Sequence, residues 1–372
     1  MSEQPAPRIG IDPYLDWIKA EGLPTYEDYG LYLFDLETKP WARVGVKAAA
    51  CHLKGRGDFA NQFLFEIPPG GSTIPQKHIY EEIVYVLEGV GSTQLEFADG
   101  TKRGFEWGPR SMFAIPLNAK YRHFNASGQK RALIVATTNF PMIMNTFYNE
   151  KFIFDTSFEF SERLGKEGYF SGEGDLVMSR PGNHMWETNF VPDLMDLKLQ
   201  EWGDRGAGAT NIMFVLANSL MHAHISEMPV GTYKKGHKHG PGTHVMIVDG
   251  TGYSLLWHEG DKDFMRLDWK HGMVFPPADR QFHQHFNTGA TRTRYLATGV
   301  GSIRYPMFAF KRRASGADGG KVMVSTSVKE GGDQIEYADQ DARIHPLFVE
   351  EMRKNGVPHK MQPYFPESEA AE

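Results

Sequence analysis

GTYKKGHKHGPGTHVMIVDG, residues 231–250, is the stretch on which the predicted fold depends. It places His237 and His239 two residues apart in a predicted strand, and because alternate strand residues point to the same face, both imidazoles are directed at one point. His283 follows in the run FHQHFN, residues 282–287, as a third candidate ligand. Three imidazoles converging on one ion suit a divalent transition metal that keeps open coordination positions.

Histidines are crowded around this stretch. Nine of the fifteen histidines fall between His222 and His285. An HxH pair on its own is often only a surface pair, so it is the crowding that favours a metal centre here.

Length and composition limit the class of protein. At 372 residues the chain can form two domains of ordinary size. Its 40 basic and 46 acidic residues are well mixed, with a net charge of -6, and so offer no basic face for nucleic acid. Glycine (39), proline (22) and aromatic residues (13%) are abundant while long helical patterns are few, which favours an all-β chain.

Cysteine and apolar residues bear on location. The single cysteine, Cys51, excludes an internal disulfide and a cysteine metal cluster, and it suits a reducing compartment. The start, MSEQPAPRIGIDP, has neither the basic segment nor the apolar core of a signal peptide. Apolar runs stay well short of the roughly 20 residues that a membrane span needs. We therefore expect a soluble, cytoplasmic protein without membrane contact.

A repeat appears when the chain is compared with itself at an offset of 161 to 162 residues. Residues 63–91 then lie over residues 224–252, with His78 on His239. Each copy shows short strand patterns separated by Gly and Pro turns. The repeat predicts two β-domains of one design.

The two repeats resemble the cupin superfamily. Its first motif joins a glycine, HxH, a glutamate and a second glycine, and its second motif joins Pro-x-Gly, a histidine and an asparagine. The matching residues are Gly231, His237, His239, Gly250, His283 and Asn287 in the second repeat, and Gly70, His78, Glu82, Gly89, Pro116 and Asn125 in the first. The resemblance implies a bicupin, with two tandem jelly-roll barrels (double-stranded β-helices) that can each hold a metal in the mouth.

Five segments follow from the repeat and the resemblance. They are an N-terminal arm with leading strands (1–55), a first cupin barrel (56–150), a connecting segment packed on the barrels (151–210), a second cupin barrel with the metal site (211–312) and a tail with a helix (313–372). Short helices are expected at 12–21, where Asp12 can cap the first turn, and within 341–358. Residues 31–50 are expected as strands that lead into the first domain.

The first repeat departs from the cupin metal motif. Gln76 replaces the first histidine and Tyr121 replaces the last, so that only His78 and Glu82 remain. Two ligands should hold a metal poorly. We therefore expect the first barrel to be structural or to form a secondary pocket.

The second repeat keeps all three histidines, but Thr243 stands where the glutamate would be. Strand alternation from His239 turns Thr243 inward and His244 outward. A bulge at residues 240–242 would reverse this and make His244 a ligand.

Three histidines without a carboxylate resemble the metal set of gentisate 1,2-dioxygenase and salicylate 1,2-dioxygenase. That resemblance implies one Fe(II) per chain, which binds an anionic chelating substrate and O2 side by side. Manganese, nickel and zinc are also compatible with three imidazoles.

Three further histidines are candidate catalytic residues. His285 shares a face with His283 and is expected either as a fourth ligand or proton shuttle, or as a residue that holds its strand, since His123 occupies the same place in the first repeat. His222 and His224 have no histidine counterparts there, which predicts support of the metal or contact with substrate.

The leading hypothesis is a metal-dependent dioxygenase acting on a small aromatic or other chelating organic acid. The alternatives are a metal-dependent hydrolase, isomerase or decarboxylase, and a non-catalytic binding bicupin. The expected partners are a small-molecule substrate, O2 and a second copy of the chain, because cupins commonly form dimers.

Overall fold

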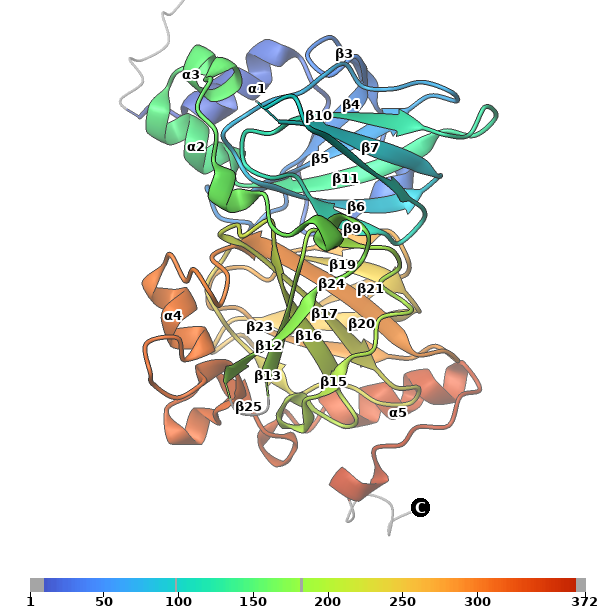
Figure 1. Cartoon of the computed structure of the whole chain (residues 1–372). Coiled ribbons are helices and arrows are strands. Elements are labelled where there is room, and N and C mark those ends of the chain that lie inside the picture. Colours follow the sequence, from blue (N-terminus) through green and yellow to red (C-terminus); the bar gives the residue numbers. More distant parts are fainter. Residues whose placement is uncertain (1–9, 98, 181–182, 366–372) are drawn as a thin grey trace, which may run out of the picture.

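The computed structural model describes residues 10–97, 99–180 and 183–365, and it shows two β-barrels that lie one above the other and pack through their large sheets (Figure 1). The large sheet of the first barrel has the strand order β1 (Thr25–Tyr26), β4 (Val46–Cys51), β5 (Asn61–Ile67), β11 (Ala132–Thr138), β6 (Glu82–Glu88), β9 (Met112–Ala114) and β14 (Phe190–Val191), with β3 (Lys39–Trp41) beside β4. The opposing sheet has the order β10 (Lys120–Asn125), β7 (Gly91–Glu96) and β8 (Lys102–Trp107).

The second barrel repeats this design. Its large sheet has the order β12 (Asp175–Arg180), β13 (Asn183–Thr188), β16 (Thr210–Leu216), β17 (Met221–Met228), β24 (Thr293–Val300), β19 (Thr243–Asp249), β22 (Met273–Phe275) and β2 (Leu31–Tyr32), with β15 (Gln200–Glu201) beside β16. Its small sheet has the order β21 (Met265–Trp269), β20 (Gly252–Trp257), β23 (Phe282–Asn287), β18 (Gly236–His237) and β25 (Gln334–Ile335). The all-β architecture of two tandem jelly-roll barrels is therefore confirmed.

Short helices decorate the barrels. They are α1 (Pro13–Glu21), α2 (Phe140–Phe147), α3 (Glu150–Asp155), α4 (Ala309–Ser315) and α5 (Ile344–Lys354), with 3-10 turns η1 (Leu33–Asp35), η2 (Ser161–Arg163), η3 (Glu167–Phe170), η4 (Gly203–Arg205), η5 (Met323–Ser325), η6 (Val328–Glu330), η7 (Tyr337–Asp339) and η8 (Gln362–Tyr364). Asp12 caps α1 as expected, because its Oδ1 accepts a hydrogen bond from Leu15 N at 3.0 Å. Among the described residues, no helix is long and apolar enough to span a membrane.

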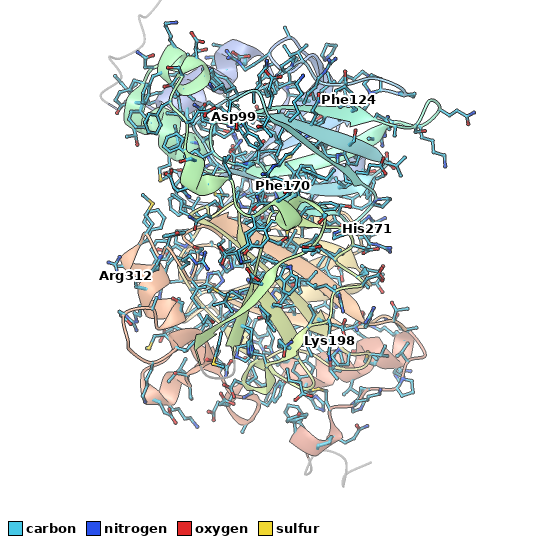
Figure 2. The ribbon with its side chains drawn as sticks, in the orientation of Figure 1. Asp99, Phe124, Phe170, Lys198, His271 and Arg312 are labelled. Carbon is cyan, nitrogen blue, oxygen red and sulfur yellow. The ribbon has the colours of Figure 1, made fainter. Side chains whose placement is uncertain are left out.

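Buried apolar side chains form several clusters, and three of them fill the barrels and the layer between them; Figure 2 labels Phe170 of the first cluster. One cluster fills the first barrel and includes Phe170 from the connecting segment. A second cluster lies between the two large sheets, where Leu64 and Val135 of the first barrel share a layer with Met246 of the second. Val245 and Ile247 belong to a third cluster inside the second barrel. The alternation along β19 thus sends neighbouring residues to opposite faces.

Two short strands pair with edges of the barrel sheets, and the first of them differs from the expected chain order. Leu31 of β2 pairs with Val274 of the second barrel, although residues 31–50 were expected to lead into the first. Phe190 of β14 pairs in return with Phe113 of the first barrel. Both strands have two residues and join sheet edges. Covering an edge satisfies its unpaired backbone groups, and a two-residue strand has no periodicity from which its partner could be predicted.

Candidate metal centre

Strand pairing brings the three predicted ligands together. His237 in β18 lies opposite His283 in β23, and His239 follows two residues later. One nitrogen from each ring lies within 4.8 Å of the others. Nitrogens that share an ion at about 2.1 Å are about 3.0 to 3.4 Å apart, so modest side-chain rotations would complete a site.

Two of the three rings are held in the tautomer that a metal requires. His239 Nδ1 lies 2.7 Å from the carbonyl oxygen of Gly240, and His283 Nδ1 lies 3.1 Å from that of Gln281. Since a carbonyl only accepts, each Nδ1 carries the proton and each Nε2 keeps its lone pair. Burial lowers the pKa of His239 to about 4, so this ring is neutral, as a ligand must be.

The third ring, His237, has a different neighbour. Arg205, at the end of η4, places Nη2 2.5 Å from His237 Nδ1. Its Nη1 donates to the carbonyl oxygen of Val324 at 2.9 Å and to the side-chain oxygen of Gln334. A guanidinium only donates, so His237 Nδ1 must accept in this arrangement.

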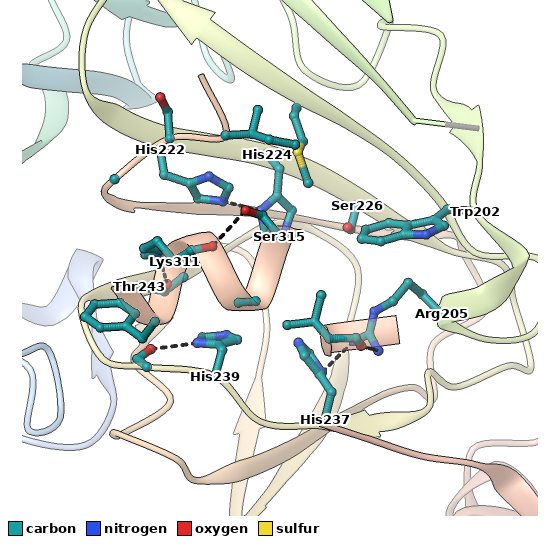
Figure 3. Close-up of a pocket in the computed structure, with 18 of the residues that line it drawn as sticks. Trp202, Arg205, His222, His224, Ser226, His237, His239, Thr243, Lys311 and Ser315 are labelled. Atoms are coloured by element: carbon teal, nitrogen blue, oxygen red, sulfur yellow. Dashed lines mark hydrogen bonds between the residues drawn. The ribbon is translucent and has the colours of Figure 1, made fainter. Parts of the chain in front are cut away.

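Two of the three predicted ligands, His237 and His239, line a pocket of about 820 Å³ (Figure 3). His237 and His239 form one side of it, and α4 contributes Lys311. Arg205 and Lys234 also line the pocket. None of the described lining residues is an aspartate or a glutamate. The protein side chains by themselves therefore make the pocket strongly cationic.

The cations of this pocket lack acidic partners. Among the described residues, no carboxylate lies within ion-pair distance of Arg205, Lys234 or Lys311. Lys311 Nζ has Thr243 Oγ1 at 3.5 Å, and burial lowers the pKa of Lys311 to about 8. Burial likewise lowers the pKa of Arg205 to about 10. Buried charges without counterions are costly, which favours a role in binding an anion.

His222 and His224 line the same pocket from β17. His222 Nε2 lies 2.7 Å from His224 Nδ1, and burial lowers both pKa values well below that of a free imidazole. In the first barrel the aligned positions, Asn61 and Phe63, are buried. The two histidines that the second repeat has and the first repeat lacks thus lie at the pocket. There one neutral imidazole donates its N–H to the other.

A second polar pair lies in the pocket wall. Lys234 Nζ donates to Tyr295 Oη at 3.0 Å, and both side chains are buried. Burial alone would raise the pKa of Tyr295, but the ammonium of Lys234 beside it lowers the pKa overall. The sequence analysis missed this pair, together with Arg205 and Lys311, because these residues come from separate segments and form no motif.

His285 is part of an arrangement that both barrels share. Its Nδ1 lies 2.8 Å from Ser254 Oγ, which also accepts from Trp269 Nε1 at 2.9 Å. In the first barrel, His123 and Trp107 make the same contacts with Thr93, at 2.8 and 3.0 Å. A contact that recurs away from the metal triad favours the interpretation in which His285 holds its strand.

The ligand positions of the first barrel are closed by their own contacts. His78 Nε2 lies 2.9 Å from Tyr121 Oη and 3.6 Å from Glu82 Oε1. The ring of Tyr80 stacks on His78 with centroids 3.5 Å apart, and the amide of Gln76 donates to the carbonyl oxygen of Arg43 at 3.0 Å. His78 Nδ1 lies 2.9 Å from the carbonyl oxygen of Tyr80, so both ring nitrogens of His78 have protein partners in this structure.

His244 points away from the triad. It is fully buried, and neither ring nitrogen has a hydrogen-bond partner among the described residues. Its neighbour Thr243 lines the pocket. The alternation without a bulge, with Thr243 inward and His244 outward, is the arrangement that the structure shows.

No protein-family model matches the chain, and no curated protein matches it. Among solved structures, a variant of oxalate decarboxylase from Bacillus subtilis is 11% identical with a TM-score of 0.48, covering 74% of this chain and 78% of that one. The formate complex of oxalate decarboxylase from Lactobacillus farciminis is 12% identical with a TM-score of 0.48, covering 75% and 87%.

A third structure, of the same Bacillus enzyme, comes from a study of its Mn(II) centres and is 12% identical with a TM-score of 0.47, covering 76% and 79%. Similarity at this level says nothing about the reaction of the present chain.

Proposed function

We propose that the protein is a metal-dependent enzyme that acts on a small chelating organic acid, with one divalent transition metal on His237, His239 and His283. The observation that carries this proposal is the pocket itself. It joins two imidazoles of the triad, His237 and His239, to three cationic side chains, and none of its described lining residues is a carboxylate.

The charges explain why an acid is the expected substrate. Three neutral imidazoles leave the double charge of an ion uncompensated, and Arg205 and Lys311 add positive charge with no carboxylate within ion-pair distance among the described residues. A substrate carboxylate would compensate this charge and accept charge-assisted hydrogen bonds. A neutral or cationic substrate would leave the pocket with its full electrostatic penalty.

The leading reaction is an oxygenase reaction with Fe(II). A redox-active ion held by the triad would supply Lewis acidity and electron transfer to O2. The protein residues have other tasks in this scheme. Arg205 and Lys311 hold the carboxylate, while the His222–His224 pair and Tyr295 exchange protons with the substrate.

A second candidate is a non-oxidative lyase reaction such as decarboxylation. The proton-carrying groups of the pocket favour it, because a carboxylate lost as CO2 must be replaced by a proton. His222, His224 and Tyr295 are uncharged or weakly acidic groups that line the pocket and can deliver one. In this reaction the ion would act as a Lewis acid and O2 would not be consumed.

Elemental analysis of protein purified without added metal tests the site. We expect about one transition-metal ion per chain, loss of the ion in His237→Ala, and its retention in His78→Ala. The second variant is the matched control, because it removes the aligned histidine of the other barrel. Two ions per chain, or an ion lost with His78 rather than His237, would contradict the proposal.

Oxygen dependence then separates the two reactions. The metal-loaded protein is incubated with a panel of hydroxybenzoic, oxo- and dicarboxylic acids, in air and under strict anaerobiosis, with His237→Ala as the blank. Turnover that consumes O2 supports the oxygenase, whereas turnover that persists without O2 and releases CO2 supports the lyase. If His237→Ala binds and converts acids as the wild type does, the enzyme proposal is wrong.

A further inference from the structure

The contact between Arg205 and His237 conflicts with metal binding. In the structure His237 Nδ1 accepts a hydrogen bond from the guanidinium, so the proton of the neutral ring is on Nε2. An ion bound through Nε2 moves that proton to Nδ1, where two donors would then face each other. An ion bound through Nδ1 would need the lone pair that Arg205 already engages. Either way, the hydrogen bond between Arg205 and His237 must break when the ion binds.

The surroundings of Arg205 show what it could bind after release. Its backbone is fixed, since Lys235 N donates to the Arg205 carbonyl oxygen at 3.1 Å. Nη1 has partners of its own in the carbonyl oxygen of Val324 and the side chain of Gln334, and Nη2 is the nitrogen that the contact with His237 occupies. The pocket into which this nitrogen would turn has no carboxylate among its described lining residues. In Figure 3 Arg205 lies beside His237, while Lys311 lies across the pocket beyond His239.

We propose that Arg205 is a metal-linked anchor for the substrate carboxylate: without metal it is held on His237, and the bound ion releases it to the acid. This inference rests on the proposed function and adds an order of binding, metal before acid. Metal-free protein would keep its guanidinium engaged, and acids would bind weakly to it. Arg205 acts as a positioning residue for the substrate and opposes binding of the ion.

The proposal predicts effects of opposite sign in one variant. Arg205→Met removes a cation and a competing hydrogen-bond donor from His237, so the Zn(II) affinity of the variant should rise by about tenfold. The usual result is the opposite, because removing a contact that supports a metal ligand lowers the metal affinity about 10- to 100-fold. The same variant loses a charge-assisted hydrogen bond to the acid. Salicylate, which has a carboxylate next to a hydroxyl, should bind the Zn(II)-loaded variant about 10- to 100-fold more weakly than the loaded wild type.

Lys311→Met is the matched comparison. It removes another of the three pocket cations, whose amine is 3.5 Å from Thr243 Oγ1. Its salicylate affinity should also fall, but its Zn(II) affinity should rise less than that of Arg205→Met. Isothermal titration of metal-free protein with Zn(II), and of loaded protein with salicylate, measures both constants for each variant. Arg205→Met binding Zn(II) no more tightly than Lys311→Met, or binding salicylate as tightly as the wild type, overturns the proposal.

A measurement on the unaltered chain covers the case in which Arg205→Met does not fold. The guanidinium resonances of Arg205, identified with Arg205→Lys in arginine-labelled protein, should shift when Zn(II) is added without any acid. Unchanged resonances in Zn(II)-loaded protein reject the release. If the wild type binds no divalent ion at the triad, the proposed function fails as well; if it binds both ion and acid while the variants do not diverge, only the role of Arg205 fails.

Discussion

Replacing Ser254 by alanine should destabilise the second barrel through two buried partners at once. The Ser254 hydroxyl accepts from Trp269 Nε1 at 2.9 Å and contacts His285 Nδ1 at 2.8 Å, and all three side chains are buried. Each buried polar group left without a partner costs about 1–3 kcal/mol. We therefore expect a loss of about 2–4 kcal/mol in the free energy of unfolding, since some relaxation and water entry reduce the full sum.

Urea unfolding followed by tryptophan fluorescence measures this loss. The matched variant is Thr93→Val, which removes the corresponding hydroxyl of the first barrel while keeping the shape of the side chain. Equal losses in the two barrels, with the metal content of Ser254→Ala unchanged, would support a strand-holding role for His285. A loss below about 0.5 kcal/mol would refute the reasoning, because the hydroxyl would then not be satisfying both partners.

Three further predictions concern stability and the pocket. His244 is buried with both ring nitrogens unpaired, so His244→Leu should raise the free energy of unfolding by about 1–2 kcal/mol in urea titrations, and a decrease would reveal a partner for the ring. Burial raises the pKa of Glu81 to about 7 despite Arg163, so the folded state holds a proton that the unfolded carboxyl releases near its ordinary pKa. The contribution of Glu81 to the free energy of unfolding is therefore fully present below the unfolded pKa and is lost as the pH rises through about 7. The urea midpoint of the wild type should fall between pH 5 and pH 8 for this reason. Glu81→Gln should make that fall smaller. A Cβ on Gly240 would lie 2.3 Å from the ring of Phe310 in α4, so Gly240→Ala should displace this helix. Calorimetry should then show weaker binding of salicylate to the Zn(II)-loaded variant than to the loaded wild type. Unchanged binding would show that α4 is not part of the acid site.

The metal triad was the part of the site that the sequence could predict. His237 and His239 are two residues apart, and strand periodicity alone puts such a pair on one face. His283 was found because the second repeat aligns with the first, where the same register ends in Tyr121. The same alignment separated the degenerate motif from the complete one. Short-range spacing, internal duplication and the resemblance to the cupin motifs together led to these conclusions.

The charges around the triad were decided by the tertiary structure alone. Arg205, Lys234 and Lys311 lie on η4, beside β18 and on α4, and no spacing rule connects them. The pairing of β2 and β14 also could not be predicted from the sequence, because each is a two-residue strand that pairs with a sheet edge far away in the chain. Local periodicity sets which face a residue takes within its own strand. Which distant groups share a pocket depends on how the sheets pack, and a linear pattern contains no measure of that distance.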